Sequence, residues 1–350
     1  MQGVDIKGDV FVGANVLLYA ALPALGAYVP DSAFLVAAAS AACGNVGLLG
    51  CRVLDIGCGI GVTTAAIVKT HPKEIIAVDA SPDMARLMSK VLLTDENIKN
   101  YLEDNDARTI LGEGSNGLFE KAFFYLQYHR QDFQNGLVRN AEIRTKSGLE
   151  ITREDSKGFV EAVIGSHYIH WPVNQLMSTG QTLGEACRQA LNPLADLVSS
   201  GGIVALLTTD DFFTWDADPD FEKALAVSSL TNHPLVKKAH HALSNVLLER
   251  HGIEHKPPVR THLFKKSQVR NLFRVGGLEL ESVLPCSTTV SCDPRWFPAG
   301  YPLHMGKYDL SPKDKLNAII AAREKYFQSI NSTDLPPIRT NTFTFILRKK

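Results

Sequence analysis

The sequence predicts an α/β protein built on a doubly wound, mostly parallel sheet. A glycine-rich turn at residues 57–61 separates an apolar, strand-like segment from a helical one, and the next strand-like segment ends on an acid, Asp79. Apolar strands then alternate with amphipathic helices, which is typical of a sheet covered by helices on both faces. With 350 residues, 45% hydrophobic and 21% charged, the chain can bury a full core and lacks the composition of a disordered protein.

The first elements follow one another closely. Residues 52–56 form a short apolar run typical of a buried strand, and residues 62–70 have the composition of a helix. A second apolar strand is predicted at 74–79. Ser81 and Pro82 then suit the N-cap and the first position of another helix. This strand, turn, helix, strand and helix make up the first half of a doubly wound sheet.

The later segments continue this alternation less regularly. Residues 97–136 are expected to be mostly helical, with a glycine loop at 112–117. The apolar stretch 10–29 is expected to form two short helices rather than a membrane span, because glycine, asparagine and proline interrupt it. The remaining predicted elements are a third strand at 137–138 and 141–143, a fourth strand at 159–164, a helix at 183–197, a fifth strand at 203–208, a helix at 268–275, a sixth strand at 278–284 and a closing strand at 342–347.

Charge and cysteine content narrow the class of protein. Lys plus Arg number 36 and Asp plus Glu 37, a formal net charge of −1, so no overall field attracts nucleic acid or an anionic membrane. The six cysteines form no C-x-x-C pair and are too sparse for a disulfide scaffold. The histidines between residues 240 and 262 match no recognised zinc pattern. We therefore expect free thiols, a cytoplasmic protein and no metal site.

The glycine turn and Asp79 together predict a nucleoside ligand. Glycine permits a sharp turn and leaves room for a ligand against the backbone. A dinucleotide site wants G-x-G-x-x-G, but here the third glycine, Gly61, comes one residue early and position 62 is valine. A carboxylate at the end of the next strand can accept hydrogen bonds from both ribose hydroxyls. The alternatives are a helix-capping role for Asp79 and a turn-capping role for Asp55.

At residues 53–61 (VLDIGCGIG) and 77–84 (AVDASPDM) the chain resembles the class I S-adenosylmethionine-dependent methyltransferases. The resemblance covers about residues 51–207 well and the last strands more loosely. It implies a Rossmann-like, seven-stranded sheet in which the last strand is inserted antiparallel, a part that 278–284 and 342–347 can play. It also implies S-adenosyl-L-methionine as the cofactor.

The resemblance further implies a set of cofactor-binding residues. Asp55 is expected to support the amino group of the cofactor, directly or through water, and Asp79 to bind the ribose. Asn140 stands where the family often has Asp, and its amide is expected to contact the adenine edge. The full predicted set is Asp55, Gly57, Cys58, Gly59, Gly61, Asp79, Ala80, Met84, Asn140, Ala141, Gly165 and Ser166.

Candidate catalytic residues follow the fourth strand. His167 and His170 are candidate general bases, since an unperturbed imidazole pKa near ~6.5 suits proton removal at neutral pH. Each is equally compatible with a buried, hydrogen-bonded core position. Tyr168 and Trp171 are candidates to place aromatic faces near the sulfonium. A base is needed only if the acceptor must lose a proton, as a hydroxyl or an activated carbon does and a carboxylate does not.

The segments outside the sheet should select the acceptor. They are apolar and aromatic without a strong basic excess, which favours a small, largely apolar metabolite over nucleic acid. We expect O-, N- or C-methylation by in-line displacement, no stable membrane insertion, and a chain compatible with a homodimer. The alternatives are a nicotinamide-dependent oxidoreductase and a non-catalytic cofactor-binding partner subunit. The predicted divisions are an N-terminal helical lid at 1–50, a cofactor-binding core at 51–210 with an insertion at about 95–136, a helical cap at 211–265, and the C-terminal strands at 266–350 with a cap insertion at about 286–338.

Overall fold

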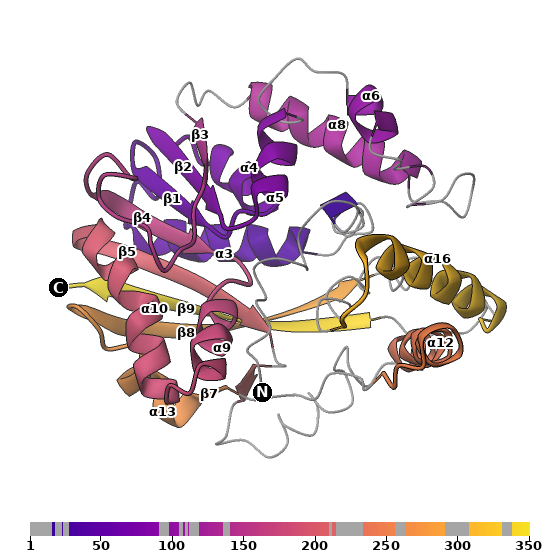
Figure 1. Ribbon diagram of the computed structural model, residues 1–350. Coiled ribbons are helices and arrows are strands. Elements are labelled where there is room, and N and C mark those ends of the chain that lie inside the picture. The colour runs from indigo at the N-terminus through magenta and orange to yellow at the C-terminus, as the bar shows by residue number, and fades with distance from the viewer. Residues whose placement is uncertain are drawn as a thin grey trace.

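The sheet is the centre of the computed structural model, which describes residues 16–17, 23, 28–90, 98–104, 108, 111, 119–135, 141–209, 212–214, 234–255, 263–290, 308–330 and 338–350. Within these residues seven strands form one mixed sheet in the order β3-β2-β1-β4-β5-β9-β8 (Figure 1). The strands are β1 (Arg52–Ile56), β2 (Glu74–Asp79), β3 (Ala141–Thr145), β4 (Val160–Gly165), β5 (Val198–Thr209), β8 (Leu278–Val290) and β9 (Ile338–Lys349). The first five run parallel and β9 is antiparallel to both of its neighbours. The predicted doubly wound sheet with an antiparallel last strand is confirmed.

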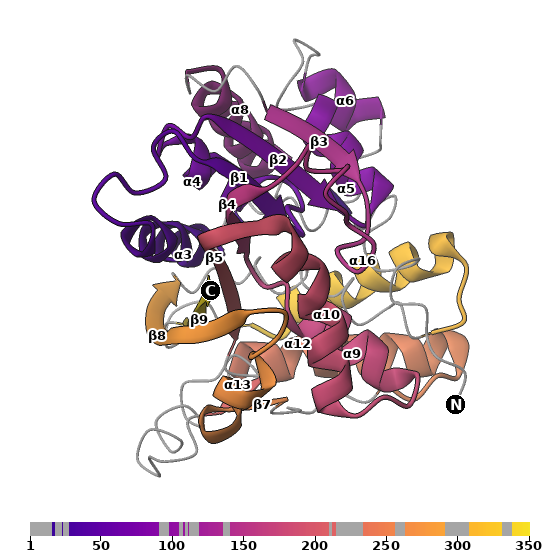
Figure 2. The same ribbon diagram turned by 90° about the vertical axis from the view of Figure 1, so that its left-hand side faces the viewer.

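Helices cover both faces of this sheet (Figures 1 and 2). Val53 and Leu54, neighbours on β1, belong to two different apolar clusters, because successive strand residues point to opposite faces. One cluster includes α3, α4, α5 and α8, and the other includes α9, α10 and α13. The helices are α3 (Val29–Ala42), α4 (Val62–Val68), α5 (Pro82–Met88), α6 (Ile98–Asp104), α8 (Phe119–Asn135), α9 (His170–Ser178), α10 (Leu183–Leu197), α12 (Pro234–His251), α13 (Lys266–Leu272) and α16 (Pro312–Gln328).

Two further features lie outside the main sheet. Helices α12 and α16 pack on each other beyond the carboxyl ends of the parallel strands (Figure 1). The short strands β6 (Phe213–Thr214) and β7 (Phe264–Lys265) form a separate parallel pair. Among the described residues, no helix is both long and apolar enough to cross a membrane.

The start of α5 is as predicted. The hydroxyl of Ser81 accepts a hydrogen bond from the backbone N–H of Met84 at 3.1 Å, and Pro82 occupies the first turn. A side-chain oxygen at the N-cap satisfies one of the free N–H groups at a helix start, and proline there loses no hydrogen bond. The helix therefore begins at Pro82, three residues after Asp79 at the end of β2.

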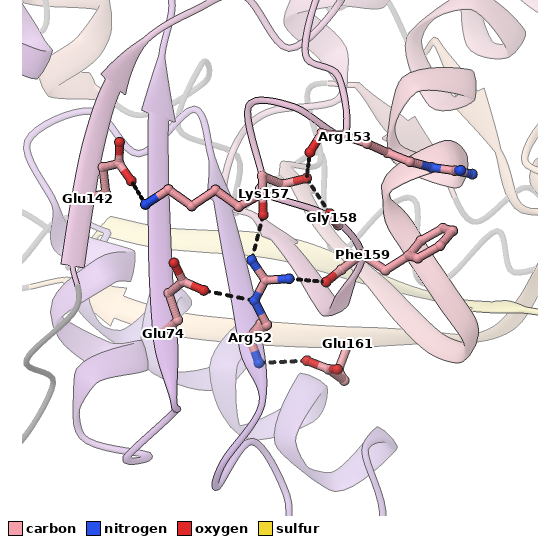
Figure 3. A network of polar contacts seen from close by, with 9 residues as sticks. Arg52, Glu74, Glu142, Arg153, Lys157, Gly158, Phe159 and Glu161 are labelled. Atoms are coloured by element: carbon pink, nitrogen blue, oxygen red, sulfur yellow. Dashed lines mark hydrogen bonds and ion pairs between the residues drawn. The ribbon is translucent and has the colours of Figure 1, made fainter.

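A polar network ties the amino ends of the parallel strands together (Figure 3). The guanidinium of Arg52 donates to the Glu74 carboxylate at 2.8 Å and to the Phe159 carbonyl at 2.6 Å. Lys157 pairs with Glu142 of β3 at 2.7 Å. These contacts hold β1, β2, β3 and the segment before β4 in register at the edge opposite the carboxyl ends.

The third strand contains the predicted residues 141–143, but its end was predicted wrongly, and residues 137–138 lie outside the described residues. Strand β3 runs from Ala141 to Thr145, and Ala141 pairs with Ile75 at the amino end of β2. Ala141 therefore opens the strand rather than following it, and Asn140 lies outside the described residues. The segment that follows β3 begins at Lys146, whose N–H donates to the Asp79 carbonyl at 2.8 Å. As an edge strand, β3 is paired on one side and half-exposed, so it lacks the apolar run that marked the other strands.

Other boundaries differ by smaller amounts. Strand β4 begins one residue later than predicted, α13 begins two residues earlier, and β5, β8 and β9 extend well beyond their apolar centres. Helix α8 lies in the stretch expected to be helical, with Phe119 and Phe133 buried and Phe124 and Tyr128 exposed. Most of the predicted N-terminal helical stretch and the 112–117 loop fall outside the described residues.

Candidate functional site

The glycine turn joins β1 to α4 at the carboxyl end of the sheet. Gly57, Gly59 and Gly61 have φ angles of 68°, 53° and 89°, in the left-handed region that favours glycine. The N–H of Gly57 donates to the Val78 carbonyl at 2.8 Å, which ties the turn to the end of β2. A Cβ added to Gly59 would meet no atom within 4 Å, so the backbone there is uncovered. The turn thus presents bare backbone that a ligand can approach.

Asp79 is bound to the same turn. One carboxylate oxygen accepts the N–H of Gly59 at 2.8 Å, and the other accepts the N–H of Ser81 at 2.8 Å. Burial raises the pKa of Asp79, while these two hydrogen bonds act in the opposite direction. Each oxygen of an ionised carboxylate can accept more than one hydrogen bond. Asp79 therefore has a structural role and keeps the capacity to bind a ligand.

A cavity of about 160 Å³ lies at the carboxyl ends of β1, β2 and β4. Ligands of open α/β sheets bind in the crevice at this edge. The cavity is smaller than the roughly 300–1,000 Å³ of a pocket that buries a small ligand, so such a ligand would extend beyond it. Eight of the predicted cofactor-binding and catalytic residues line it together: Gly57, Gly59, Asp79, Ala80, Met84, Ser166, His167 and Tyr168.

Four predicted cofactor-binding residues lie behind this wall rather than on it. Cys58 is buried within the turn, Gly61 caps α4, and Gly165 packs against Ile56 and Leu206. Asp55 is fully buried and accepts a hydrogen bond from the Thr64 hydroxyl. Its second oxygen, Oδ1, has no hydrogen-bond partner among the described residues, and burial raises the pKa of Asp55 to about 7. A buried oxygen without a partner calls for a donor.

His170 is not among the described residues that line the cavity. Its Nδ1 lies 3.1 Å from the Thr208 hydroxyl, and its ring stacks on Phe212 with centroids 4.1 Å apart. Burial lowers the pKa of His170 well below its usual value, so the ring is neutral. This environment is that of a core histidine, the second of the two interpretations that the sequence left open.

His167 lies on the cavity wall in a conformation that non-glycine residues rarely adopt, with φ 52°. Its ring meets the edge of Tyr28, with centroids 4.8 Å apart. Burial lowers the pKa of His167 to about 4, which leaves the imidazole neutral at pH 7. A neutral imidazole in a cavity wall can accept a proton.

Tyr168 packs on two glycines of the site. A Cβ on Gly57 would lie 3.0 Å from the Tyr168 ring, and a Cβ on Gly148 would overlap its hydroxyl. That hydroxyl is buried without a hydrogen-bond partner among the described residues, and burial raises the pKa of Tyr168. The two glycines make room for the tyrosine between the turn and the segment that follows β3.

The sequence interpretation missed several residues of the cavity. These are Ser81, residues 146–149 after β3, Pro172 and Gln175; Trp171, named from the sequence, also lines it. Had the sequence indicated that β3 ends at Thr145, residues 146–149 would have been predicted to line the site, because the segments that follow parallel strands meet at one edge of the sheet. Helix α3 also reaches the site, since the Ser32 hydroxyl lies 3.5 Å from that of Ser166. No local motif marks Ser32.

Among the described residues, no group of three or more His, Cys, Asp or Glu side chains is placed to hold a metal ion.

Residues 53–140 match the family model of a methyltransferase domain. The match confirms the resemblance to class I S-adenosylmethionine-dependent methyltransferases that the glycine turn and Asp79 carried. The chain therefore contains a methyltransferase domain, and its sheet has the antiparallel last strand that the resemblance implied.

Comparison with other proteins adds the following. No curated protein matches the chain. Among solved structures, the chain is similar to the YcgJ protein from Bacillus subtilis, at 13% identity over 92% of this chain and 99% of that one, with a TM-score of 0.41. It is also similar to magnesium protoporphyrin IX methyltransferase from Synechocystis, at 12% identity over 92% and 84%, with a TM-score of 0.40. A S-adenosylmethionine-dependent methyltransferase from Thiobacillus denitrificans gives 13% identity over 91% of both chains and a TM-score of 0.40. Similarities this distant carry no argument about substrate.

Proposed function

We propose that this protein transfers a methyl group from S-adenosyl-L-methionine to a small, largely apolar acceptor at the cavity beside the glycine turn. One observation carries the proposal. Gly57, Gly59 and Asp79, from the segment that matches the methyltransferase domain, line the same cavity as His167 and Tyr168, which follow β4. The cofactor-binding and candidate catalytic residues thus share one site, although they come from distant parts of the sequence.

The residues present fit the cofactor. Gly59 offers uncovered backbone for the methionine part, Gly57 lines the same cavity beside Tyr168, and Asp79 keeps acceptor capacity for the ribose hydroxyls. Ala80 and Met84 provide an apolar border for the adenine. The partnerless Oδ1 of Asp55, buried behind the turn, fits a positively charged amino group, directly or through water. When bound, S-adenosylmethionine supplies a methyl group already activated on a sulfonium.

Residues 146–149 take over the role that the sequence assigned to Asn140 and Ala141. They follow β3 directly, line the cavity and are joined to the Asp79 carbonyl through the N–H of Lys146. A segment in that position would border the base of a nucleoside whose ribose is held by Asp79.

The contribution of the protein to the reaction is largely positioning. Holding acceptor and donor in line can supply much of the rate enhancement of a displacement reaction. His167 is the candidate base, because it is neutral and lies on the cavity wall. Tyr168 and Trp171 also line the cavity, where aromatic rings stabilise a sulfonium. His170 holds α9 against the end of β5.

Composition supports the acceptor class. The net charge of −1 and the apolar segments outside the sheet favour an uncharged or weakly charged small molecule over nucleic acid. We assign that selection to a lid at 1–50 and caps at 211–265 and about 286–338, around a core at 51–210 and 266–350. Free thiols at Cys43, Cys51, Cys58, Cys187 and Cys286 are consistent with a reducing compartment, and we propose a cytoplasmic location.

The experiment is to incubate the full chain with methyl-labelled S-adenosylmethionine and a small-molecule extract. We expect a labelled small molecule with the wild type and a strongly reduced yield with Asp79→Ala. Label in protein or nucleic acid would overturn the acceptor class. Binding of the cofactor without transfer would favour the non-catalytic partner subunit, and binding of NAD alone would favour the oxidoreductase.

A further inference from the structure

A buried carboxylate from outside the sheet lies beside His167. Asp31 is in the first turn of α3 and only 3% exposed, and its Oδ2 is 3.8 Å from Nε2 of His167. Helix α3 packs against β4, β5, β8 and β9, and its Ser32 hydroxyl bonds that of Thr63 on α4 at 3.0 Å. The first turn of α3 is therefore anchored at the edge of the proposed site.

The Asp31 carboxylate is held in a defined orientation. The hydroxyl of Thr288 on β8 donates to Oδ1 at 3.2 Å, so Oδ2 is the oxygen that faces His167. Among the described residues, His167 is the only basic side chain within 4 Å of Asp31. Burial raises the pKa of Asp31 to about 6, so most of it is ionised at pH 7. Among the described residues, the other titratable groups near the pair are Cys286 on β8, Tyr28 ahead of α3, Tyr168 two residues before α9, and His170 at the start of α9.

His167 is positioned to respond to that carboxylate. Its Nε2 is buried and has no hydrogen-bond partner among the described residues. The separation of 3.8 Å is too long for a hydrogen bond but within the range of an ion pair once the imidazole is protonated. A carboxylate at this distance favours the protonated imidazole and orients the ring so that Nε2 faces Asp31. Nδ1 is then the nitrogen left to take a proton, and His167 lines the cavity.

We propose that Asp31 is the positioning residue for His167, and that the pair serves an acceptor that must lose a proton, an uncharged hydroxyl or an activated carbon acid rather than a carboxylate. This inference rests on the proposed methyl transfer. A carboxylate acceptor needs no base, so a cavity-wall histidine with a buried carboxylate behind it would have no task with such a substrate.

The O–H or C–H bond of the acceptor breaks, its proton passes to Nδ1 of His167, and its electron pair forms the bond to the methyl carbon. The electron pair of the sulfur–carbon bond stays on sulfur, so the products are the methylated acceptor, S-adenosylhomocysteine and a protonated His167. Asp31 stabilises that imidazolium until its proton passes to solvent.

The first test is an NMR titration of the His167 imidazole in the full chain saturated with S-adenosylhomocysteine. The signal is assigned by its loss in His167→Gln. In the wild type we expect its shift to change with a midpoint near pH 6, because Asp31 titrates beside it. In Asp31→Asn the change near pH 6 should vanish, leaving only the titration of His167 itself near pH 4. The same midpoint in both proteins would overturn the proposal.

Two further variants keep this test interpretable. Thr288→Val removes one of the two hydroxyls, those of Thr288 and Thr342, that lower the pKa of Asp31, so the midpoint should move above pH 6. Ser40→Ala is the matched control, since Ser40 also lies on α3 and its hydroxyl accepts the N–H of Leu48 at 3.3 Å, away from Asp31 and His167. The midpoint should be unchanged in Ser40→Ala. If Asp31→Asn fails to fold, an unmoved midpoint in Thr288→Val still overturns the proposal.

The second test uses methyl-labelled S-adenosylmethionine with phenols, 1,3-dicarbonyl compounds and matched carboxylic acids, together with a small-molecule extract. We expect label in hydroxyl or carbon acceptors and a kcat lowered roughly 10²–10³-fold in His167→Gln. Asp31→Asn should lower kcat roughly 10–100-fold, keep KM within about threefold and remove the fall in rate below pH 6. Carboxyl methylation at an unchanged rate in His167→Gln would overturn the proposal. Absence of S-adenosylhomocysteine binding in the wild type would instead refute the proposed function itself.

Discussion

Asp79→Ala is expected to weaken both the fold and cofactor binding, by amounts that can be measured separately. The substitution removes the acceptor for the N–H groups of Gly59 and Ser81, each now 2.8 Å from a carboxylate oxygen. An unsatisfied buried donor costs about 1–3 kcal/mol, so the two together cost about 2–6 kcal/mol. Relief of the buried charge offsets part of this cost, because burial raises the pKa of Asp79. We therefore expect a loss of about 2–3 kcal/mol in the free energy of unfolding.

The effect on affinity has a different origin. If Asp79 accepts hydrogen bonds from ribose hydroxyls, its removal should weaken S-adenosylhomocysteine binding by roughly one to two orders of magnitude. That corresponds to about 1.4–2.8 kcal/mol. Urea unfolding gives the stability change and calorimetric titration of the folded variant gives the affinity.

Asp83→Asn is the matched control for this pair of measurements. Asp83 lies four residues further along, in the first turn of α5, and does not line the cavity. It should leave affinity within about threefold, because Asp83 is not among the residues that line the cavity and its carboxylate pairs with Arg86 at 3.4 Å. A destabilised Asp79→Ala protein that binds S-adenosylhomocysteine as tightly as the wild type would refute the reasoning. Asp79 would then only stabilise the glycine turn, and the ribose of the cofactor would bind elsewhere.

Two further predictions concern stability. Gly148→Ala should lower the free energy of unfolding by about 1–3 kcal/mol, because the new Cβ overlaps the Tyr168 hydroxyl and lies 2.7 Å from Ile56 Cδ1. Gly184→Ala on α10, where nothing lies within 4 Å of the new Cβ, should instead raise it by about 0.5–1 kcal/mol. Urea unfolding measures both changes. Burial raises the pKa of Asp55 from 3.8 to about 7, so its protonated form favours folding and that contribution is lost as pH rises through 7. Asp55→Asn should therefore gain up to about 3 kcal/mol on the wild type between pH 5 and pH 8, and an equal difference at both pH values would contradict this.

The central part of the fold could be predicted because its signals are local. Strands β1 and β2 are buried on both sides and read as continuous apolar runs, and Ser81 with Pro82 marks the start of α5. Strand β3 gave no such run, since Glu142 and Arg144 occupy a half-exposed edge and interact with each other. The register of β3 is set by its pairing with β2, and no sequence pattern within 141–145 indicates that pairing.

The site was predictable only where its residues belong to the sheet motif. Gly57, Gly59 and Asp79 line the cavity because the turn and the end of β2 share one edge. The two histidines could not be separated from the sequence, because burial against Thr208 and Phe212 removes His170 from the cavity, and both contacts are tertiary. Asp31 has no sequence signal, since it meets His167 only after α3 docks on the sheet.

The most direct test of the account is a calorimetric titration of the full chain with S-adenosylhomocysteine and, separately, with NAD. If the glycine turn and Asp79 form the proposed site, S-adenosylhomocysteine should bind saturably at one site per chain and NAD should give no binding heat. Saturable binding of NAD with no response to S-adenosylhomocysteine would contradict the assignment of the cavity to a methyl donor.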